Sequence, residues 1–184
     1  MYYRMNVCGL ERDLPLCKLT DDLYIAGFVI FGDVELTVRC AEELLKIAPE
    51  YDYLLTAESK GIPLIHEMAR QSGQNEYILA RKAPKLYMQE PFGVCVKSIT
   101  TAKEQHLYLD KVDADKIKGK KILIVDDVIS TGESLAALEK LVEAADGIIC
   151  GKLAVLAEGA AQQRSDIGYL HGLPLFNPDG TVKA

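Results

Sequence analysis

The chain has 184 residues, 49% of them hydrophobic and 26% charged, which suits one soluble globular domain with a full core. Its net charge of −6 argues against a nucleic-acid partner, which would require a basic face. No apolar run is long enough to span a membrane and the first residues do not resemble a signal peptide, so we expect a cytoplasmic protein without a membrane partner. Five scattered cysteines without a C-x-x-C pair favour reduced thiols over disulfides or a zinc site.

Three short apolar runs open the chain, at residues 2–8, 14–19 and 23–30, with charged residues between them. They predict strands or hairpins, which would form a lid outside a main sheet. Asp33 is then placed to cap a helix that Pro49 ends. The apolar face of this predicted helix consists of Val34, Val38, Ala41, Leu44, Leu45 and Ala48.

The next unit is a predicted strand at residues 53–57, a loop at 58–61 and a helix at 63–72. Gly61 permits a backbone conformation that bulkier residues resist, and Lys60 lies beside backbone N–H groups of the loop. The pattern indicates an anion site, with a plain helix-start turn as the alternative.

A third predicted strand, at residues 77–80, ends in Arg81, Lys82 and Lys85. Positive charge at this edge of a sheet suits an anionic ligand, although a set of solvated cations is the alternative. Residues 86–109 then lack a helical period and contain a Pro-Phe-Gly turn, which predicts a long two-stranded flap.

The most informative stretch follows a polar connection at residues 110–120. Four β-favouring aliphatic residues lead into Asp126 and Asp127, then a short polar loop, then a helical pattern at 135–145. Ligands of open α/β sheets bind at this edge of the strands. The loop N–H groups, the helix N-terminus and three hydroxyls suit a phosphate. The hydroxyls belong to Ser130, Thr131 and Ser134.

The two adjacent carboxylates would repel that phosphate. They suit neutral hydroxyls, such as a sugar diol, or a magnesium ion. A phosphate and a diol about one sugar apart describe a ribose 5-phosphate, and the alternative is an ordinary strand–turn–helix with a solvated acidic end. Beyond this stretch, residues 147–157 predict a further strand, and the tail from residue 158 predicts a helix and then a strand at 170–176.

The strand, acidic pair and loop resemble the phosphoribosyl-pyrophosphate (PRPP) signature of the type I phosphoribosyltransferases. This resemblance implies an α/β fold with a central, mostly parallel sheet flanked by helices. It also implies one domain over residues 1–184, with a core at about 33–157 and a small hood at about 1–32 and 158–184. A flexible two-stranded flap at about 83–109 would close over the site and exclude water.

The resemblance also implies roles for individual residues. The catalytic residues would be Asp126, Asp127 and Lys85. The 5-phosphate would bind at Val128, Ile129, Ser130, Thr131, Gly132, Glu133 and Ser134. Pyrophosphate would bind at Glu58, Ser59, Lys60, Gly61, Arg81 and Lys82. The base would bind at Val29, Phe31 and Glu158, and Mg²⁺ would bind through PRPP, with the two aspartates as candidate ligands.

Finer marks favour the adenine enzymes of the family. The loop at residues 58–61, the segment 27–33 and the cations from Arg81 to Lys85 resemble theirs, while residues 80–88 also resemble bacterial xanthine enzymes. Hypoxanthine-guanine members usually carry Glu-Asp in place of the two aspartates, and orotate members carry a flap motif that is absent here.

Two positions depart from the adenine pattern. Residues 100–103 lack the Glu and Tyr of the adenine flap, so Glu104 or Glu158 would have to replace the acid that faces a purine nitrogen. Glu133 stands where the family usually has Gly, and its side chain would repel the 5-phosphate if it pointed inward.

The resemblance therefore implies a Mg²⁺-dependent purine salvage enzyme that forms a nucleoside 5′-monophosphate and pyrophosphate, with adenine ahead of xanthine or hypoxanthine. A homodimer is expected by the same resemblance. The alternatives are a non-catalytic PRPP-sensing regulator and a nucleoside- or pyrimidine-directed member. The three histidines belong to no ligand pattern, and His66, within a predicted helix, is interpreted as structural.

Overall fold

The computed structural model describes residues 1–97 and 104–183. Its centre is a five-stranded sheet with the strand order β10-β9-β8-β4-β5, in which all neighbouring strands pair in parallel. The strands are β4 (Tyr53–Ala57), β5 (Ile78–Ala80), β8 (Lys121–Ile129), β9 (Ile148–Glu158) and β10 (Gly168–Leu173). The expected parallel sheet is confirmed.

Both faces of the sheet are buried, which explains the continuous aliphatic runs in its strands. Successive side chains of a strand point to opposite faces, so Leu123 and Val125 join one hydrophobic cluster while Ile122 and Ile124 join the other. The first cluster extends into the N-terminal strands, and the second lies under α4 (Glu133–Ala144). The core is therefore one sheet between two apolar layers.

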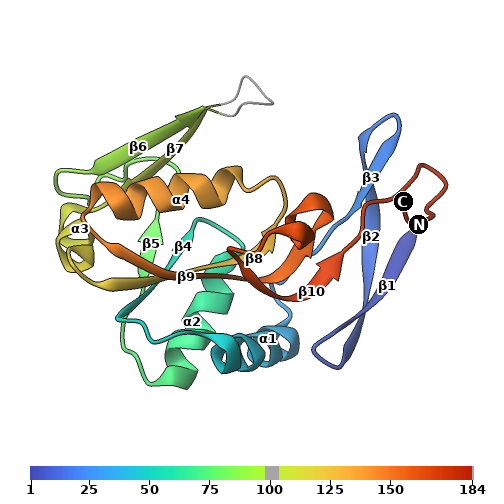
Figure 1. The fold of residues 1–184 in the computed structure, drawn as a ribbon, viewed down its shortest axis with the longest axis horizontal. Helices are drawn as coiled ribbons and strands as arrows, with labels where there is room; N and C mark the ends of the chain where they lie inside the picture. The colour runs from blue at the N-terminus through green and yellow to red at the C-terminus, as the bar shows by residue number, and fades with distance from the viewer. Residues whose placement is uncertain (98–103, 184) are drawn as a thin grey trace.

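The helices are divided between the two faces (Figure 1). α1 (Val34–Ile47) and α2 (Gly61–Ser72) cover one face, and α4 covers the other. A short helix, α3 (Lys111–Ile117), occupies the region predicted to be a polar connection. It forms because the Asp110 side chain accepts a hydrogen bond from Val112 N–H and caps it.

The predicted cap of α1 is confirmed, and its predicted apolar face is confirmed only in part. Asp33 Oδ1 accepts a hydrogen bond from Leu36 N–H at 3.1 Å. Four residues of that face pack inward, namely Ala41, Leu44, Leu45 and Ala48. Val34 is 73% exposed, because α1 is rotated so that its buried face also includes Leu36 and Cys40. The sequence offers two overlapping apolar faces at helical spacing, and packing selects between them. The buried residues are Leu36, Thr37, Cys40, Ala41 and Leu44.

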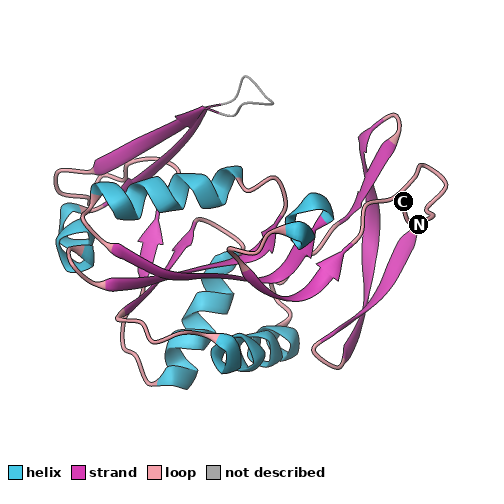
Figure 2. Ribbon diagram, in the orientation of Figure 1, coloured by secondary structure: helices cyan, strands magenta, loops and turns pink. Residues whose placement is uncertain are grey.

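The N-terminal strands form a separate antiparallel sheet (Figure 2), as the three apolar runs predicted. Its members are β1 (Tyr2–Val7), β2 (Leu10–Thr20) and β3 (Leu23–Ala26). The C-terminal tail returns to this sheet, where Phe176 pairs with Tyr24 through two backbone hydrogen bonds of 2.9 Å. The Phe176 side chain is fully buried, 4.9 Å between ring centroids from Tyr3. The two ends of the chain thus build one unit, residues 1–32 and 174–183, which we call the hood. It is smaller than the hood expected at 1–32 and 158–184, because β10 joins the central sheet.

Two antiparallel strands, β6 (Phe92–Lys97) and β7 (Glu104–Leu109), form the flap that the sequence predicted. A bridge between Arg81 and Tyr108 joins the flap to the end of β5. The adenine-type flap positions at residues 100–103 lie outside the described residues. In the tail, a 3₁₀ helix (Gly159–Gln163) precedes β10, in the predicted order, but the strand begins two residues earlier than expected. Among the described residues, no helix has the length and apolar character to cross a membrane.

Candidate active site

The chain connections of the sheet diverge between β4 and β8. β4 continues through α2 to β5 on one side, whereas β8 continues through α4 to β9 on the other. The loops that follow these neighbouring strands therefore part at the carboxyl edge, which is where open α/β sheets bind ligands. A pocket of about 490 Å³ lies at this edge, and both loops line it.

Asp126 and Asp127 lie within β8, and not after its end as the sequence suggested. β8 continues to Ile129 because its pairing with β9 reaches that residue, whereas its pairing with β4 ends at Ile124. The two aspartates therefore lie in the part of β8 that has β9 as a neighbour on one side and no strand on the β4 side. Both of them line the 490 Å³ pocket.

The two carboxylates have different surroundings. Asp127 is 4% exposed, and its Oδ2 lies 2.7 Å from Lys60 Nζ. Asp126 Oδ1 accepts a hydrogen bond from Asp127 N–H at 2.9 Å. Burial, followed by the neighbouring Asp127 carboxylate, raises the pKa of Asp126 well above its usual range. A ligand that donates hydrogen bonds or carries positive charge would stabilise the ionised pair.

Lys60, directly before α2, connects the sheet to the hood. Besides its ion pair with Asp127, its Nζ donates a hydrogen bond to the Phe28 carbonyl at 3.2 Å. Phe28 belongs to the segment between β3 and α1. The ammonium group predicted for pyrophosphate is thus directed at the acidic pair in this structure.

Gly61 is required for a reason that the sequence did not indicate. It is the first residue of α2, and a Cβ at this position would lie 2.2 Å from Thr56 Oγ1 and 3.6 Å from Asp126 Oδ1. The position is therefore restricted by the close approach of α2 to β4, and not by an unusual backbone conformation. This approach brings the start of α2 against the acidic pair.

The Glu58 carboxylate contacts each of the three cationic residues that follow β5. Its Oε1 lies 3.2 Å from Arg81 Nη2 and 3.9 Å from Lys85 Nζ, and its Oε2 accepts a hydrogen bond from Lys82 N–H at 3.1 Å. Arg81 Nε is buried and has no hydrogen-bond partner among the described residues. Lys82 and Ser59 line the 490 Å³ pocket. Glu58 thus orients positive charge beside the pocket.

The loop between β8 and α4 encloses a smaller pocket of about 110 Å³. The pocket is lined by Asp126 and by every residue from Val128 to Leu135. Gly132 has a φ of 81° and caps α4, and a Cβ there would lie 2.5 Å from Arg164 Nη1. The loop and the first turn of the helix therefore surround a space that suits a phosphate. Glu133 is half-buried and takes part in the lining as the first residue of α4.

His106 and Leu107 of the flap also line the 490 Å³ pocket, although the sequence assigned neither to the site. The His106 ring stacks on Tyr108, with 6.3 Å between centroids and 12° between planes. Their approach to the sheet edge depends on the backbone pairing of Tyr108 with Arg81, at 2.8 Å in both directions. No local pattern in the flap sequence could have indicated this contact between distant segments.

The three predicted base-binding residues are spread over different places. Glu158 is 8% exposed at the end of β9, on the same sheet edge as the acidic pair. Val29 and Phe31 are 57% and 51% exposed, and neither belongs to the described lining of the 490 Å³ pocket. Phe31 instead lines a pocket of about 480 Å³ between α1 and α2, together with His66. The structure does not bring these three side chains together.

Comparison with known proteins supplies independent evidence. The family described as "Phosphoribosyl transferase domain" matches residues 38–173. A hypoxanthine/guanine phosphoribosyltransferase of Methanothermococcus okinawensis is 32% identical over 138 residues, covering 73% of this chain and 71% of the relative. An adenine phosphoribosyltransferase of Rhodococcus jostii is 29% identical over 139 residues, covering 76% of each chain.

The fold is also found in solved structures. The adenine phosphoribosyltransferase of Saccharomyces cerevisiae, in complex with adenine and an imino-altritol bisphosphate, has a TM-score of 0.66 and 21% identity. The match covers 86% of this chain and 92% of that one. Fold, site geometry and sequence similarity agree, and the chain belongs to the phosphoribosyltransferase family, with adenine and hypoxanthine/guanine enzymes among its relatives.

Proposed function

We propose that the chain transfers the 5-phosphoribosyl group of PRPP to a purine base, with adenine as its preferred acceptor. The observation that carries this proposal is the position of the acidic pair between two anion-compatible places. On one side lies the 110 Å³ loop pocket, and on the other lie the cations around Glu58. A phosphate, a sugar diol and a pyrophosphate follow one another in PRPP in this order.

The ribose 5-phosphate half of PRPP would occupy β8 and its loop. The loop from Val128 to Ser134 would bind the phosphate through N–H groups and hydroxyls, and the first turn of α4 adds partial positive charge. Asp126 and Asp127 would accept hydrogen bonds from the two ribose hydroxyls. Those hydrogen bonds favour the ionised pair, which burial alone disfavours.

The pyrophosphate half would occupy the loop after β4 and the end of β5. Lys82, Lys85 and the free Arg81 Nε would bind the phosphoryl oxygens, with the Ser59 region completing the lining. Glu58 would act as a positioning residue, since its carboxylate contacts all three of these cationic residues. Preorganised cations at the leaving group are effective because they need no rearrangement as charge develops.

The chemistry of the pocket fits a magnesium ion bound with PRPP. Asp126 and Asp127 supply hard oxygen donors, the ligand class that Mg²⁺ prefers, and among the described side chains Lys60 forms its ion pair with Asp127 rather than with Asp126. When bound, the ion would neutralise part of the charge on the pyrophosphate. Most of its ligands would come from PRPP and water, since Mg²⁺ usually keeps several waters.

During the transfer, positive charge would develop on the ribose ring. As the bond from C1 to the pyrophosphate oxygen breaks, C1 becomes oxocarbenium-like before a purine nitrogen bonds to it. The Asp126–Asp127 pair would stabilise this charge from the hydroxyl side of the ring. His106 and Leu107 of the flap line the same pocket and would limit the access of water, which otherwise competes with the base.

The base would enter from the hood. The Lys60 hydrogen bond to the Phe28 carbonyl brings the segment between β3 and α1 to the edge of the pocket, so backbone groups there, rather than the exposed Val29 and Phe31 side chains, would recognise the purine. Glu158 would serve as the acid that faces a purine nitrogen. Adenine is favoured by the loop and cation pattern, and hypoxanthine or guanine is the second candidate because relatives of both kinds match.

The deciding experiment measures pyrophosphate release from PRPP and Mg²⁺ with adenine, hypoxanthine, guanine, xanthine, orotate or uracil supplied separately. We expect release with adenine at a kcat/KM at least tenfold above the other purines. A preference for another purine would overturn the adenine assignment and leave the transferase proposal intact. PRPP binding by calorimetry without release from any base would instead indicate a PRPP-sensing regulator, and absence of PRPP binding would contradict both.

A further inference from the structure

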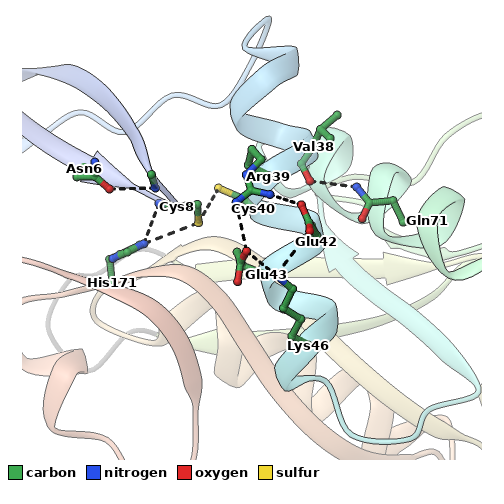
Figure 3. A network of polar contacts seen from close by, with 11 residues as sticks. Asn6, Cys8, Val38, Arg39, Cys40, Glu42, Glu43, Lys46, Gln71 and His171 are labelled. Carbon is green, nitrogen blue, oxygen red and sulfur yellow. Dashed lines mark hydrogen bonds and ion pairs between the residues drawn. The ribbon is translucent and has the colours of Figure 1, made fainter.

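Outside the active site, three reactive side chains from three distant segments meet where the hood contacts the core (Figure 3). Cys8 lies in the turn between β1 and β2, Cys40 lies in α1, and His171 lies in β10. The two sulfur atoms are 3.8 Å apart, and Cys8 Sγ is 3.7 Å from His171 Nε2. All five cysteines of the chain are free thiols in this structure. Cys8 and Cys40 are therefore reduced and in contact.

The backbone at Cys8 is unusual for cysteine. Cys8 has a φ of 54° and Gly9 a φ of 86°, which makes this two-residue connection a turn of the type that favours Asn-Gly. A side chain other than Gly, Asn or Asp is uncommon in this left-handed region. The turn itself thus gives no reason for a cysteine, whereas the contact with Cys40 does.

His171 is arranged as a base toward Cys8. Its Nε2 accepts a hydrogen bond from the Cys8 backbone N–H at 3.0 Å, so this nitrogen carries a lone pair and not a proton. The same nitrogen is the one that faces Cys8 Sγ. The Cys40 thiol, which can donate a hydrogen bond to a Cys8 thiolate, lowers the pKa of Cys8 below its usual range. The thiol of Cys40 is fully buried, and the contact with Cys8, together with burial, raises its pKa.

The two thiols thus have complementary properties. Cys8 is half-buried, in reach of a small oxidant and disposed to ionise, whereas Cys40 is buried and protonated. An accessible thiolate next to a protonated thiol is the arrangement in which an oxidised sulfur is trapped as a disulfide. We propose that Cys8 and Cys40 are a peroxide-sensitive modification site that closes into a disulfide between the hood and the core, with His171 as the base.

The reaction balances with one molecule of hydrogen peroxide as oxidant. Cys8 transfers its proton to His171 Nε2, and its sulfur attacks one peroxide oxygen, which breaks the O–O bond and gives a sulfenic acid. The released hydroxide takes the proton from His171 and becomes water. The Cys40 sulfur then attacks Cys8 Sγ, the S–O bond breaks, and the leaving hydroxide takes the Cys40 proton as a second water. Two thiols lose two electrons to the peroxide.

The disulfide would connect positions that are 32 residues apart in the chain. It would fix the β1–β2 turn to α1. The segment that contacts Lys60 through the Phe28 carbonyl lies just before this helix. A disulfide that closes a loop of this length reduces the conformational entropy of the unfolded chain and so stabilises the fold. The oxidised protein is therefore expected to unfold at a temperature roughly 5–10 °C above that of the reduced protein.

The test begins with the reduced wild-type protein and iodoacetamide at neutral pH. We expect Cys8 to be alkylated at least about tenfold faster than Cys17, which is exposed and serves as the internal control. After treatment with a stoichiometric amount of hydrogen peroxide, the intact mass should fall by two hydrogen atoms. Peptide mapping should then show Cys8 joined to Cys40, and a thiol reductant should reverse both changes.

Three variants complete the test. Cys8→Ser should abolish the mass loss, while Cys17→Ser should leave it unchanged. His171→Gln retains an oxygen that can accept the Cys8 N–H hydrogen bond but removes the base, so alkylation of Cys8 should slow by about tenfold and its pH dependence should move to higher pH. Equal alkylation rates at Cys8 and Cys17, or peroxide-treated wild type without a Cys8–Cys40 peptide, would overturn the proposal. All of these measurements are independent of catalytic activity.

Discussion

The carboxyl edge of the central sheet and the hood differ in how the chain builds them. At the edge, each functional loop is one contiguous stretch between a strand and the helix that follows it, as at residues 58–61 and 128–134. The hood joins the first strands to a tail about 150 residues later, through the pairing of Tyr24 with Phe176. We infer that the PRPP half of the site depends on local structure and the base half on long-range packing.

The largest expected effect comes from removing the side chain that closes the hood. Phe176→Ala should lower the free energy of unfolding by about 3–5 kcal/mol, because a fully buried ring is replaced by a cavity. Denaturant titration measures this loss. Below the unfolding transition, KM for the purine should rise more than KM for PRPP. An equal rise in both KM values would contradict the inference that the hood supports base binding and the sheet edge supports PRPP binding. Phe176→Leu, which keeps an apolar side chain at this position, is the milder control.

A substitution at the carboxyl edge of the sheet should reduce catalytic activity more than it reduces stability. Asp127→Asn should reduce kcat by about 10²–10³-fold, because the variant loses charge that stabilises the ribose centre. The unfolding temperature should change by less than about 4 °C, since the Lys60 partner remains partly exposed to water. Pyrophosphate release and thermal unfolding measure the two effects. The exposed Asp115→Asn is the matched control, and unchanged kcat in Asp127→Asn would refute the ribose assignment.

The junction of hood and core supplies a pH-dependent test. Arg12 of β2, and then the Leu36 N–H of α1, hold the pKa of Asp33 below its usual value. The carboxylate therefore stabilises the fold above its unfolded pKa of about 3.9, and this contribution is lost as pH falls through the lower folded value. Asp33→Ala should cost about 1 kcal/mol at pH 7.

The difference between wild type and Asp33→Ala should then shrink in unfolding measurements taken below about pH 3. A difference that stays constant from pH 7 down to about pH 2 would show that lost side-chain packing, and not the charged cap, explains the loss. Asp33→Asn, which retains a capping oxygen, is the control for the charge alone.

The smallest expected effect concerns the residue that departs from the family pattern within the phosphate loop. Glu133→Gln should lower KM for PRPP by about two- to fourfold, because a negative charge at the 110 Å³ pocket disfavours a phosphate. The effect should weaken as ionic strength rises. Glu143→Gln, exposed in the last turn of the same helix, should leave KM unchanged. A higher KM in Glu133→Gln would indicate that Glu133 orders the loop.

Much of the edge was predictable because its signals are local. A strand of aliphatic residues, an acidic pair and a Gly-containing loop predicted β8 and α4, and a similar pattern predicted β4 and α2. The boundaries were less well predicted. Asp126 and Asp127 were expected to follow β8, yet they lie within it, because pairing with β9 extends the strand to Ile129. Strand ends are set by neighbours, and the neighbours are distant in sequence.

Other parts of the site could not be predicted from local patterns. The inward face of α1 was chosen by packing, because two apolar faces at helical spacing compete. His106 reached the pocket only through the pairing of Tyr108 with Arg81. The requirement for Gly61 came from the approach of Thr56, which is a contact between strand and helix.

By itself, the sequence determined the alternation of strands and helices, the acidic pair and the two loops at one sheet edge. Those features depend on periodicity and on side-chain chemistry within a few neighbouring residues. Only the tertiary structure decided the ion pair of Lys60 with Asp127, the gathering of cations by Glu58 and the contact of Cys8 with Cys40. Each of these joins segments that come together only when the sheet forms and the hood closes on it.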